Sequence, residues 1–276
     1  MKLGISTYTY TWAIGVPHYQ PPKNPLSALG LLELANHLRV KVVQFADNLP
    51  IHLLSQGELK RVRDIAEDYE LEIELGTRGV EPKELLTYLE LAKFFKAKIV
   101  RTLLHSTTSS PDLGQAYEWI SEVAPQFASS NIAIAIENHD RYTARELARL
   151  IEAIDNPYVG ICLDTVNSFG ALEGPQTVLD QLGPYVNNLH FKDFDVVRAD
   201  HQMGFNIHGT PAGSGRLNAD WLLNELASYK KDPNLILELW TPFAGTVEET
   251  VAKENQWAEQ SIGFLWKKLE GIRCQS

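Results

Sequence analysis

Four side chains of the kinds that bind divalent metal ions stand near the ends of short apolar segments in the second half of the chain. They are Glu137, Asp164, His190 and Glu238, in the strings IAIAIEN, GICLDTVN, NNLHFKD and LILELW. Consecutive members are 27, 26 and 48 residues apart, so units of similar length separate the first three. A carboxylate within an apolar strand is costly to bury unless something compensates its charge. We therefore expect the four side chains to surround one point.

The chemistry that suits such a group is metal binding. Three carboxylates close together would repel one another and raise one another's pKa, and a divalent cation removes this repulsion. An oxygen-rich donor set with one nitrogen favours Mn²⁺, Mg²⁺ or Co²⁺ in roughly octahedral geometry, with positions left for substrate oxygens. Zn²⁺ is compatible but less suited, since the group has no cysteine and a single histidine. For any one of the four residues alone, the alternative is a structural side chain held by a salt bridge.

The segments that must position these residues alternate between two kinds. Short runs rich in Val and Ile predict strands at residues 3–8, 42–46, 71–76, 99–104, 132–137, 159–164, 186–191 and 235–240. Stretches with helical periodicity between them predict helices, among them residues 26–39, 58–69, 82–95, 113–128, 144–154, 219–229 and 246–269. Thr143 with Glu146 three residues later is a capping box that starts one of these helices. Apolar strands alternating with amphipathic helices are typical of a parallel sheet covered by helices.

Eight such strand–helix units in 276 residues predict an α/β protein with a single (β/α)₈ TIM barrel that spans residues 1–276. The alternative is an open doubly wound sheet, which usually has fewer strands and a glycine-rich first turn. Here the first connection, residues 9–25, is aromatic and proline-rich instead. Because barrel enzymes place their chemistry at the carboxyl ends of the strands, the four metal-type residues lie where an active site is expected.

Two connections are longer than usual for a barrel and are expected to be functional. They are residues 9–25 after the first strand and residues 192–218 after the seventh. The second contains GTPAGSG, which has neither a preceding strand nor the third glycine of a nucleotide-binding turn. We expect this loop to fold over the mouth of the barrel.

The strings ENH, CLDTVNS, LHFKD and LELW, together with the opening KLGISTYTY, resemble those of the xylose isomerase-like TIM barrel superfamily of sugar phosphate isomerases and epimerases. The resemblance spans nearly the whole chain. Members include ketose 3-epimerases, hydroxypyruvate isomerases, inosose dehydratases, 3-dehydroshikimate dehydratases and sugar-acid decarboxylases. The resemblance therefore implies a metal-dependent barrel enzyme and is less specific about the reaction.

In the epimerases of this superfamily, two metal-bound glutamates exchange protons with a substrate carbon from opposite faces. The resemblance assigns this role to Glu137 and Glu238. A metal chelated by a carbonyl and a neighbouring hydroxyl stabilises the enediolate that forms when the C–H bond is broken. Two bases then give epimerisation, and one base that returns the proton to the next carbon gives isomerisation.

The chain departs from the ketose 3-epimerase pattern at several positions. Thr143 stands where those enzymes have a second glutamate and Asn167 where they have histidine, and Gln44 replaces a residue that is acidic in many relatives. Lys192, two residues after His190, is expected on the same inward face. It would bind a substrate carboxylate or act as an acid in a dehydratase or decarboxylase. The alternative is that Lys192 pairs with Asp193 or Asp195 at the rim.

Further side chains at the predicted mouth are candidates for substrate contacts. They are His105, His139, Asn167, Arg198, His208, Trp12 and Trp240. For the histidines the alternative is a hydrogen-bonded rim residue, and for the tryptophans it is packing. Arg78 and Arg101 would receive a carboxylate or phosphate, or Arg101 would form a structural ion pair inside the barrel.

Two functions therefore stand foremost: a metal-dependent isomerase or epimerase of a sugar, sugar acid or keto-polyol, and a lyase on the same scaffold that dehydrates or decarboxylates such a substrate. An abasic-site endonuclease would need more histidine and acidic ligands and a basic face. A metal-free binding protein would be expected to have lost part of the four-residue group, and all four residues are present.

The charge composition limits the classes of molecule that this protein is expected to bind. The 35 acidic residues outnumber the 25 Lys and Arg, for a formal net charge of −10, which argues against nucleic-acid binding. The resemblance, and not the charge, implies a small carbohydrate-like substrate. The opening MKLGISTYTYTW lacks the apolar core of a signal peptide, and no stretch is long enough to span a membrane. Two cysteines, Cys162 and Cys274, are typical of a reducing compartment, so a cytoplasmic protein is expected. The oligomeric state stays open between a monomer and a homo-oligomer.

Overall fold

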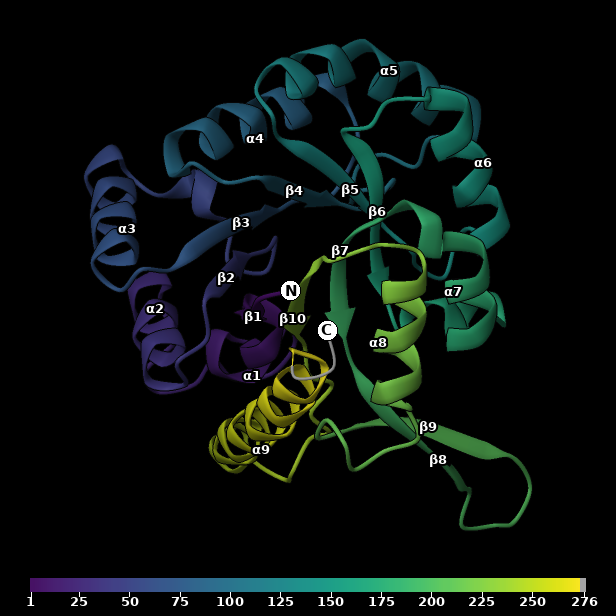
Figure 1. Cartoon of the computed structure of the whole chain (residues 1–276). Coiled ribbons are helices and arrows are strands. Elements are labelled where there is room, and N and C mark those ends of the chain that lie inside the picture. Colours follow the sequence, from purple (N-terminus) through teal and green to yellow (C-terminus); the bar gives the residue numbers. More distant parts are fainter. Residues whose placement is uncertain (274–276) are drawn as a thin grey trace.

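The computed structural model describes residues 1–273. Within them, eight parallel strands form a closed barrel, which confirms the predicted (β/α)₈ fold. The strands are β1 (Leu3–Ser6), β2 (Val42–Phe45), β3 (Glu72–Gly76), β4 (Ile99–Thr102), β5 (Ala133–Glu137), β6 (Val159–Asp164), β7 (Val186–Phe191) and β10 (Asn234–Leu237). β10 pairs with both β7 and β1, and this closes the barrel (Figure 1).

A ring of helices surrounds the barrel and covers its outer face (Figure 1). The helices are α1 (Thr11–Ile14), α2 (Ala28–His37), α3 (Gln56–Asp68), α4 (Pro82–Phe95), α5 (Leu113–Ser129), α6 (Ala144–Ile154), α7 (Pro175–Leu182), α8 (Ala219–Ser228) and α9 (Val247–Arg273). The predicted capping box is present: the Thr143 hydroxyl accepts from the Glu146 backbone, and the Glu146 carboxylate accepts from the Thr143 backbone. The main apolar core lies between the strands and these helices.

Three predicted strands end more than one residue earlier in the structure, and the simplest case is the fourth, which stops at Thr102 instead of Leu104. The first strand stops at Ser6 instead of Tyr8, because the Ser6 hydroxyl accepts from Tyr8 N and starts a 3₁₀ turn over residues Thr7–Tyr10. The eighth barrel strand stops at Leu237 instead of Trp240. Glu238 therefore lies just beyond the strand, at the mouth of the barrel.

The long connection after β7 is not the loop folded over the mouth that the sequence predicts (Figure 1), and a strand does precede its glycine-rich segment. It forms an antiparallel hairpin of β8 (Asp193–Arg198) and β9 (Phe205–Thr210), which projects away from the barrel beside α8 (Figure 1). Gly209 allows the base of this hairpin to approach Trp240 closely, since a Cβ there would lie 2.5 Å from the Trp240 carbonyl oxygen. The glycine-rich segment after β9 wraps around the Asp193 carboxylate, which accepts from the backbone N–H groups of Gly213, Gly215 and Leu217.

The interior of the barrel is unusually polar. TIM barrel interiors are generally filled by branched apolar side chains. Here the buried residues on the strands include Gln44, Glu74, Arg101, Asn188 and His190. Buried polar groups must find hydrogen-bond partners, so this interior is a network and not a packed apolar plug.

No helix of the described residues is both long and apolar enough to cross a membrane. Cys162 is buried on β6 with a free thiol, whereas Cys274 lies outside the described residues.

Candidate metal centre and active site

The structure brings the four metal-type residues together at the carboxyl end of the barrel. The Nδ1 atom of His190 is 3.3 Å from one oxygen of Glu137, 3.3 Å from one oxygen of Glu238, and 3.9 Å from Asp164 Oδ2. All four side chains are buried, with exposed fractions of 2% or less. Strand pairing sets this arrangement, because β6 and β7 align Asp164 directly opposite His190.

Backbone groups hold the Asp164 carboxylate in place. Its Oδ1 accepts hydrogen bonds of 2.9 Å from the backbone N–H groups of Val166 and Asn167, where the chain turns into a short 3₁₀ helix (Asn167–Ala171). Its Oδ2 lies 2.8 Å from the ammonium of Lys192. Burial raises the pKa of Asp164, while Lys192 lowers it. One oxygen of Asp164 is thus bound by the backbone, and the other faces the site.

Glu137 is held by two side chains that reach it from neighbouring segments. Asn167 Nδ2 donates a 2.7 Å hydrogen bond to Glu137 Oε1, and the Arg101 guanidinium forms a short ion pair with Oε2. Burial alone would raise the pKa of Glu137, but Arg101 and His190 hold it well below its usual value. Of the two interpretations of Arg101, the structure therefore has the ion pair inside the barrel, and its partner is one of the metal-type residues.

Glu238 spans the gap between β1 and β7. Its Oε1 accepts a 2.9 Å hydrogen bond from the Ser6 hydroxyl, and its Oε2 lies 2.9 Å from Lys192 Nζ. Ser6 was not among the residues predicted for the site. Its place in the sequence could have indicated this role, because Ser6 is the polar residue that ends the first apolar strand, just as the four metal-type residues lie near the ends of theirs.

Lys192 places a buried cation among the carboxylates. Its Nζ lies within 2.9 Å of both Asp164 and Glu238, and its side chain is only 10% exposed. Burial would lower the pKa of Lys192, but the two carboxylates raise it above its ordinary value, so the amine is protonated. The alternative pairing at the rim does not occur, because Asp193 binds backbone N–H groups and Asp195 pairs with Arg216 at 2.6 Å.

The donor set fits a divalent cation. His190 Nδ1 is fully buried and forms no hydrogen bond with any part of the described chain, although carboxylate oxygens lie on both sides of it. A buried imidazole nitrogen without a hydrogen-bond partner, facing three carboxylates, matches an oxygen-rich metal site with one nitrogen ligand. Cys162 also lies near Glu137 and His190, but burial raises the pKa of its thiol well above the usual value, which disfavours the thiolate that binds metals.

The histidines predicted to contact substrate lie as a pair. His105 follows β4 and His139 follows β5, with ring centroids 5.8 Å apart. Burial lowers the pKa of His105 to about 4, with Arg141 adding to the effect, so this imidazole is neutral and both donates and accepts. His139 Nδ1 lies 2.5 Å from Asp140. Neither histidine contacts the four metal-type residues among the interactions of the described chain.

The predicted aromatic contacts belong to one wall of the mouth. Trp12 lies on α1 and donates a 2.8 Å hydrogen bond to the Thr241 carbonyl. Its ring packs against Tyr19 and Phe243, at centroid distances of 4.8 and 5.4 Å. Trp240 packs against the base of the β8–β9 hairpin at Gly209.

The two candidates on the hairpin lie in different places. Arg198 is exposed near the tip, where its guanidinium stacks 4.7 Å from the Phe205 ring, and the structure does not bring it to the metal-type residues. His208 lies opposite Asp195, closer to the base. A substrate contact by either residue stays a prediction.

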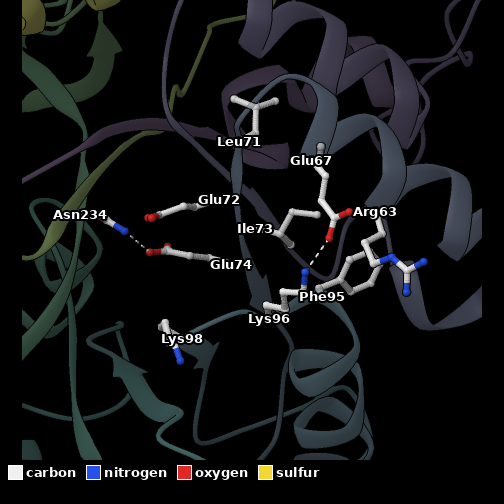
Figure 2. A pocket seen from close by; sticks show the side chains of 11 residues that line it. Arg63, Glu67, Leu71, Glu72, Ile73, Glu74, Phe95, Lys96, Lys98 and Asn234 are labelled. Carbon is white, nitrogen blue, oxygen red and sulfur yellow. Dashed lines mark hydrogen bonds and ion pairs between the residues drawn. The ribbon is translucent and has the colours of Figure 1, made fainter.

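A separate pocket of about 230 Å³ lies at the other end of the barrel (Figure 2). Its lining includes Glu72 and Glu74 from β3, Asn234 at the start of β10, and a 2.8 Å ion pair between Lys96 and Glu67. None of the four metal-type residues lines it. The site therefore lies at the carboxyl end of the strands, opposite this pocket.

Comparison with known proteins places the fold in a family. A sequence profile described as the xylose isomerase-like TIM barrel matches residues 32–268. The chain belongs to this family. One relative similar in sequence is the 3-oxo-isoapionate decarboxylase of Pectobacterium atrosepticum. The two sequences are 33% identical over 270 residues, which cover 97% of this chain and 96% of the relative.

Solved structures of xylose isomerase-like barrels share the architecture. A Mycobacterium smegmatis protein of this kind, solved in complex with magnesium, matches with a TM-score of 0.69 and 14% identity over 95% of this chain and 96% of its own. The D-psicose 3-epimerase of Clostridium cellulolyticum H10, solved with D-tagatose, matches with a TM-score of 0.71 and 14% identity over 96% and 98% of the two chains. At such identities the likeness concerns the fold. Family membership supports an enzyme of this superfamily and agrees with a divalent metal at the site.

Proposed function

We propose that this protein is a divalent-metal-dependent decarboxylase of a small 3-oxo sugar acid. The observation that carries the proposal is the buried Lys192 ammonium, which lies 2.8 Å from Asp164 and 2.9 Å from Glu238. A cation in this position suits a carboxylated substrate. The relative at 33% identity is named as a decarboxylase of a 3-oxo acid, which supports the same reaction class.

The charge of the site favours an anionic substrate. Three carboxylates, on Glu137, Asp164 and Glu238, lie with two cations, on Arg101 and Lys192. Asp47 also pairs with Arg101, and its charge is balanced by Arg78, so one net negative charge is left when His190 is neutral. With a divalent cation bound, the same group carries one net positive charge. A buried net charge is unfavourable, and a substrate with one carboxylate balances it. A neutral ketose would leave the charge uncompensated.

The proposed reaction breaks the bond between the carboxylate carbon and its neighbour. The carboxylate leaves as CO₂, the bonding electrons remain with the 3-oxo fragment as an enolate, and one proton is added to the carbon that lost CO₂. A divalent cation held by the four ligands supplies Lewis-acid stabilisation of that negative charge. Lys192 first binds the substrate carboxylate and then delivers the proton. It is a stronger acid once Asp164 and Glu238 share their charge with the metal.

Deuterium labelling separates this reaction from isomerisation. The protein is loaded with Mn²⁺ and incubated in D₂O with a panel of 3-oxo sugar acids and ketoses, and after metal removal the products are read by NMR. Release of CO₂ together with one deuterium in the shortened product supports the proposal. Deuterium in an intact carbon skeleton, without CO₂ release, would overturn it.

A lysine variant tests the observation that carries the proposal. Lys192→Met should lower kcat for CO₂ release by about 10²-fold or more, the usual contribution of a general acid. The matched control is Lys60→Met, which makes the same change at an exposed position of α3 and should leave kcat unchanged. Unaltered CO₂ release by Lys192→Met would contradict the role given to this residue.

Isomerase or epimerase activity remains the second candidate, because one observation favours it. Glu137 and Glu238 each place an oxygen 3.3 Å from His190 Nδ1, so two carboxylates flank the same point, as an exchange of protons between two bases requires. The labelling experiment above decides between the two, since only isomerisation keeps the skeleton intact.

A further inference from the structure

A chain of buried polar side chains continues from His190 into the barrel, away from the proposed substrate site. His190 Nε2 lies 2.8 Å from Gln44 Oε1, and Gln44 Nε2 donates a 3.0 Å hydrogen bond to Glu74 Oε2. Gln44 and Glu74 are buried at 0% and 2% exposure. The chain ends at the pocket in Figure 2, where Asn234 Nδ2 points to Glu74 Oε1 at 2.8 Å. These hydrogen bonds therefore connect the pocket at the amino end of the barrel to His190, one of the proposed metal ligands.

The partners of Gln44 determine which way its amide points. Its Nε2 donates to both Glu74 Oε2 and Asn188 Oδ1, at 3.0 and 3.1 Å. Asn188 is itself oriented, because its Nδ2 donates to Glu74 at 2.8 Å and its Oδ1 also accepts from the Cys162 thiol. A rotated Gln44 amide would place its carbonyl oxygen against two acceptors. The oxygen of Gln44 must therefore face His190.

The orientation of Gln44 in turn selects the tautomer of His190. A carbonyl oxygen only accepts, so the proton of the neutral imidazole resides on Nε2. The lone pair then resides on Nδ1, the orphaned nitrogen that faces Glu137, Asp164 and Glu238. Partners of this kind orient metal-binding histidines and raise their affinity for the metal.

We infer that Gln44 and Glu74 are positioning residues, which hold His190 in the tautomer that offers Nδ1 to the metal. Glu74 acts through Gln44 because both of its carboxyl oxygens accept from amide NH₂ groups, Oε2 from Gln44 and Asn188 and Oε1 from Asn234, and this keeps the NH₂ end of the Gln44 amide turned toward Glu74. The inference rests on the metal site of the proposed function and is independent of the reaction. It concerns residues on β2 and β3, which touch neither the substrate site nor any of the carboxylate ligands in the described interactions.

Two variants test this series of hydrogen bonds at different contacts. Glu74→Gln is isosteric and replaces one accepting oxygen with an NH₂ donor, so that Gln44 can turn. Gln44→Met keeps the length of the side chain and removes the acceptor. The matched control is Glu72→Gln, the same change two residues earlier on β3, at a side chain that is half exposed at the amino end of the barrel and paired with Lys2.

The first readout is the ¹⁵N NMR spectrum of the His190 ring, in the Zn²⁺-loaded protein and in the metal-free protein at a pH where the ring is neutral. We expect a protonated Nε2 in the unaltered protein and in Glu72→Gln, and a mixture of tautomers in metal-free Glu74→Gln and Gln44→Met. The second readout is the Mn²⁺ dissociation constant from calorimetry, which should rise about 10- to 100-fold in the two network variants and stay unchanged in the control.

A protonated Nδ1 in the unaltered protein overturns the inference, and this measurement needs no variant to fold. Unchanged tautomer and affinity in both network variants would overturn it as well. If CO₂ release is absent while the tautomer and the affinity respond as expected, the proposed reaction fails and the positioning role stands. If the unaltered protein binds no divalent metal, the metal site fails, and the positioning role toward a metal fails with it.

Discussion

At the scale of single residues, the site is a set of carboxylates whose oxygens each have an assigned partner. Glu137 is held by Asn167 and Arg101, Asp164 by backbone N–H groups and Lys192. Removing one member of a buried ion pair leaves the other charge uncompensated, which is more destabilising than never having had the pair. Arg101 is the clearest case, because it is only 3% exposed and pairs with both Glu137 and Asp47.

Arg101→Met should therefore lower the free energy of unfolding by about 3–5 kcal/mol. The control is Arg216→Met, which breaks an ion pair whose arginine is 60% exposed and should cost about 1 kcal/mol or less. Urea denaturation of the metal-free proteins measures both. Equal losses for the two variants would show that the Arg101–Glu137 pair is no more important than a surface contact.

At the scale of elements, a carboxylate on α9 attaches the connection after β1 to the last helix. Glu254 accepts hydrogen bonds of 3.0 Å from the backbone N–H groups of both Trp12 and Ala13, and so orients α1 and the aromatic wall of the mouth. Burial raises the pKa of Glu254 from 4.5 to about 7, even though the two N–H groups lower it. The folded protein therefore binds this proton more tightly than the unfolded chain.

The sign of the pH effect follows from that difference. The stability contributed by protonated Glu254 is present below pH 4.5 and is lost as the pH rises toward about 7, a loss of about 3 kcal/mol. Glu254→Gln cannot ionise, so its stability relative to the unaltered protein should increase by that amount between about pH 5 and about pH 8. Denaturation at both pH values checks this. A stability difference that does not vary with pH would contradict the assignment.

At the scale of the whole molecule, metal binding should be coupled to folding. The donor set exists only when β5, β6, β7 and β10 lie side by side in the sheet, so the unfolded chain has no comparable site. Binding to the folded state alone raises the free energy of unfolding by about 2.7 kcal/mol at a metal concentration of 100 times the dissociation constant.

Addition of Mn²⁺ should accordingly raise Tm by several degrees, and EDTA should reverse the change. The Glu238→Gln variant should show a smaller shift, because it removes a ligand charge with little change in shape. Equal ionic strength of a monovalent salt controls for screening of the net charge of −10. A Tm that responds equally to both salts would exclude a specific metal site.

The amino-acid sequence by itself determined the barrel and singled out the four metal-type residues that the structure brings together. Both follow from local patterns: apolar strands of similar spacing, and a donor residue near the end of each of the last four barrel strands. The hairpin after β7 is predicted as a loop, because β8 and β9 lack the apolar runs that mark the barrel strands, and in the described residues they pair with each other and not with the barrel.

Only the tertiary structure decided how these residues are held. Arg101 and Glu137 are 36 residues apart in sequence, and Gln44 and His190 are 146 apart, so their contacts depend on strand register and on closure of the barrel. Sequence spacing predicts which face of its own strand a side chain occupies. It does not predict which side chains on other strands lie at the same height in the barrel, because that height depends on strand register. Register places Lys192 among the carboxylates and brings the Gln44 oxygen to His190.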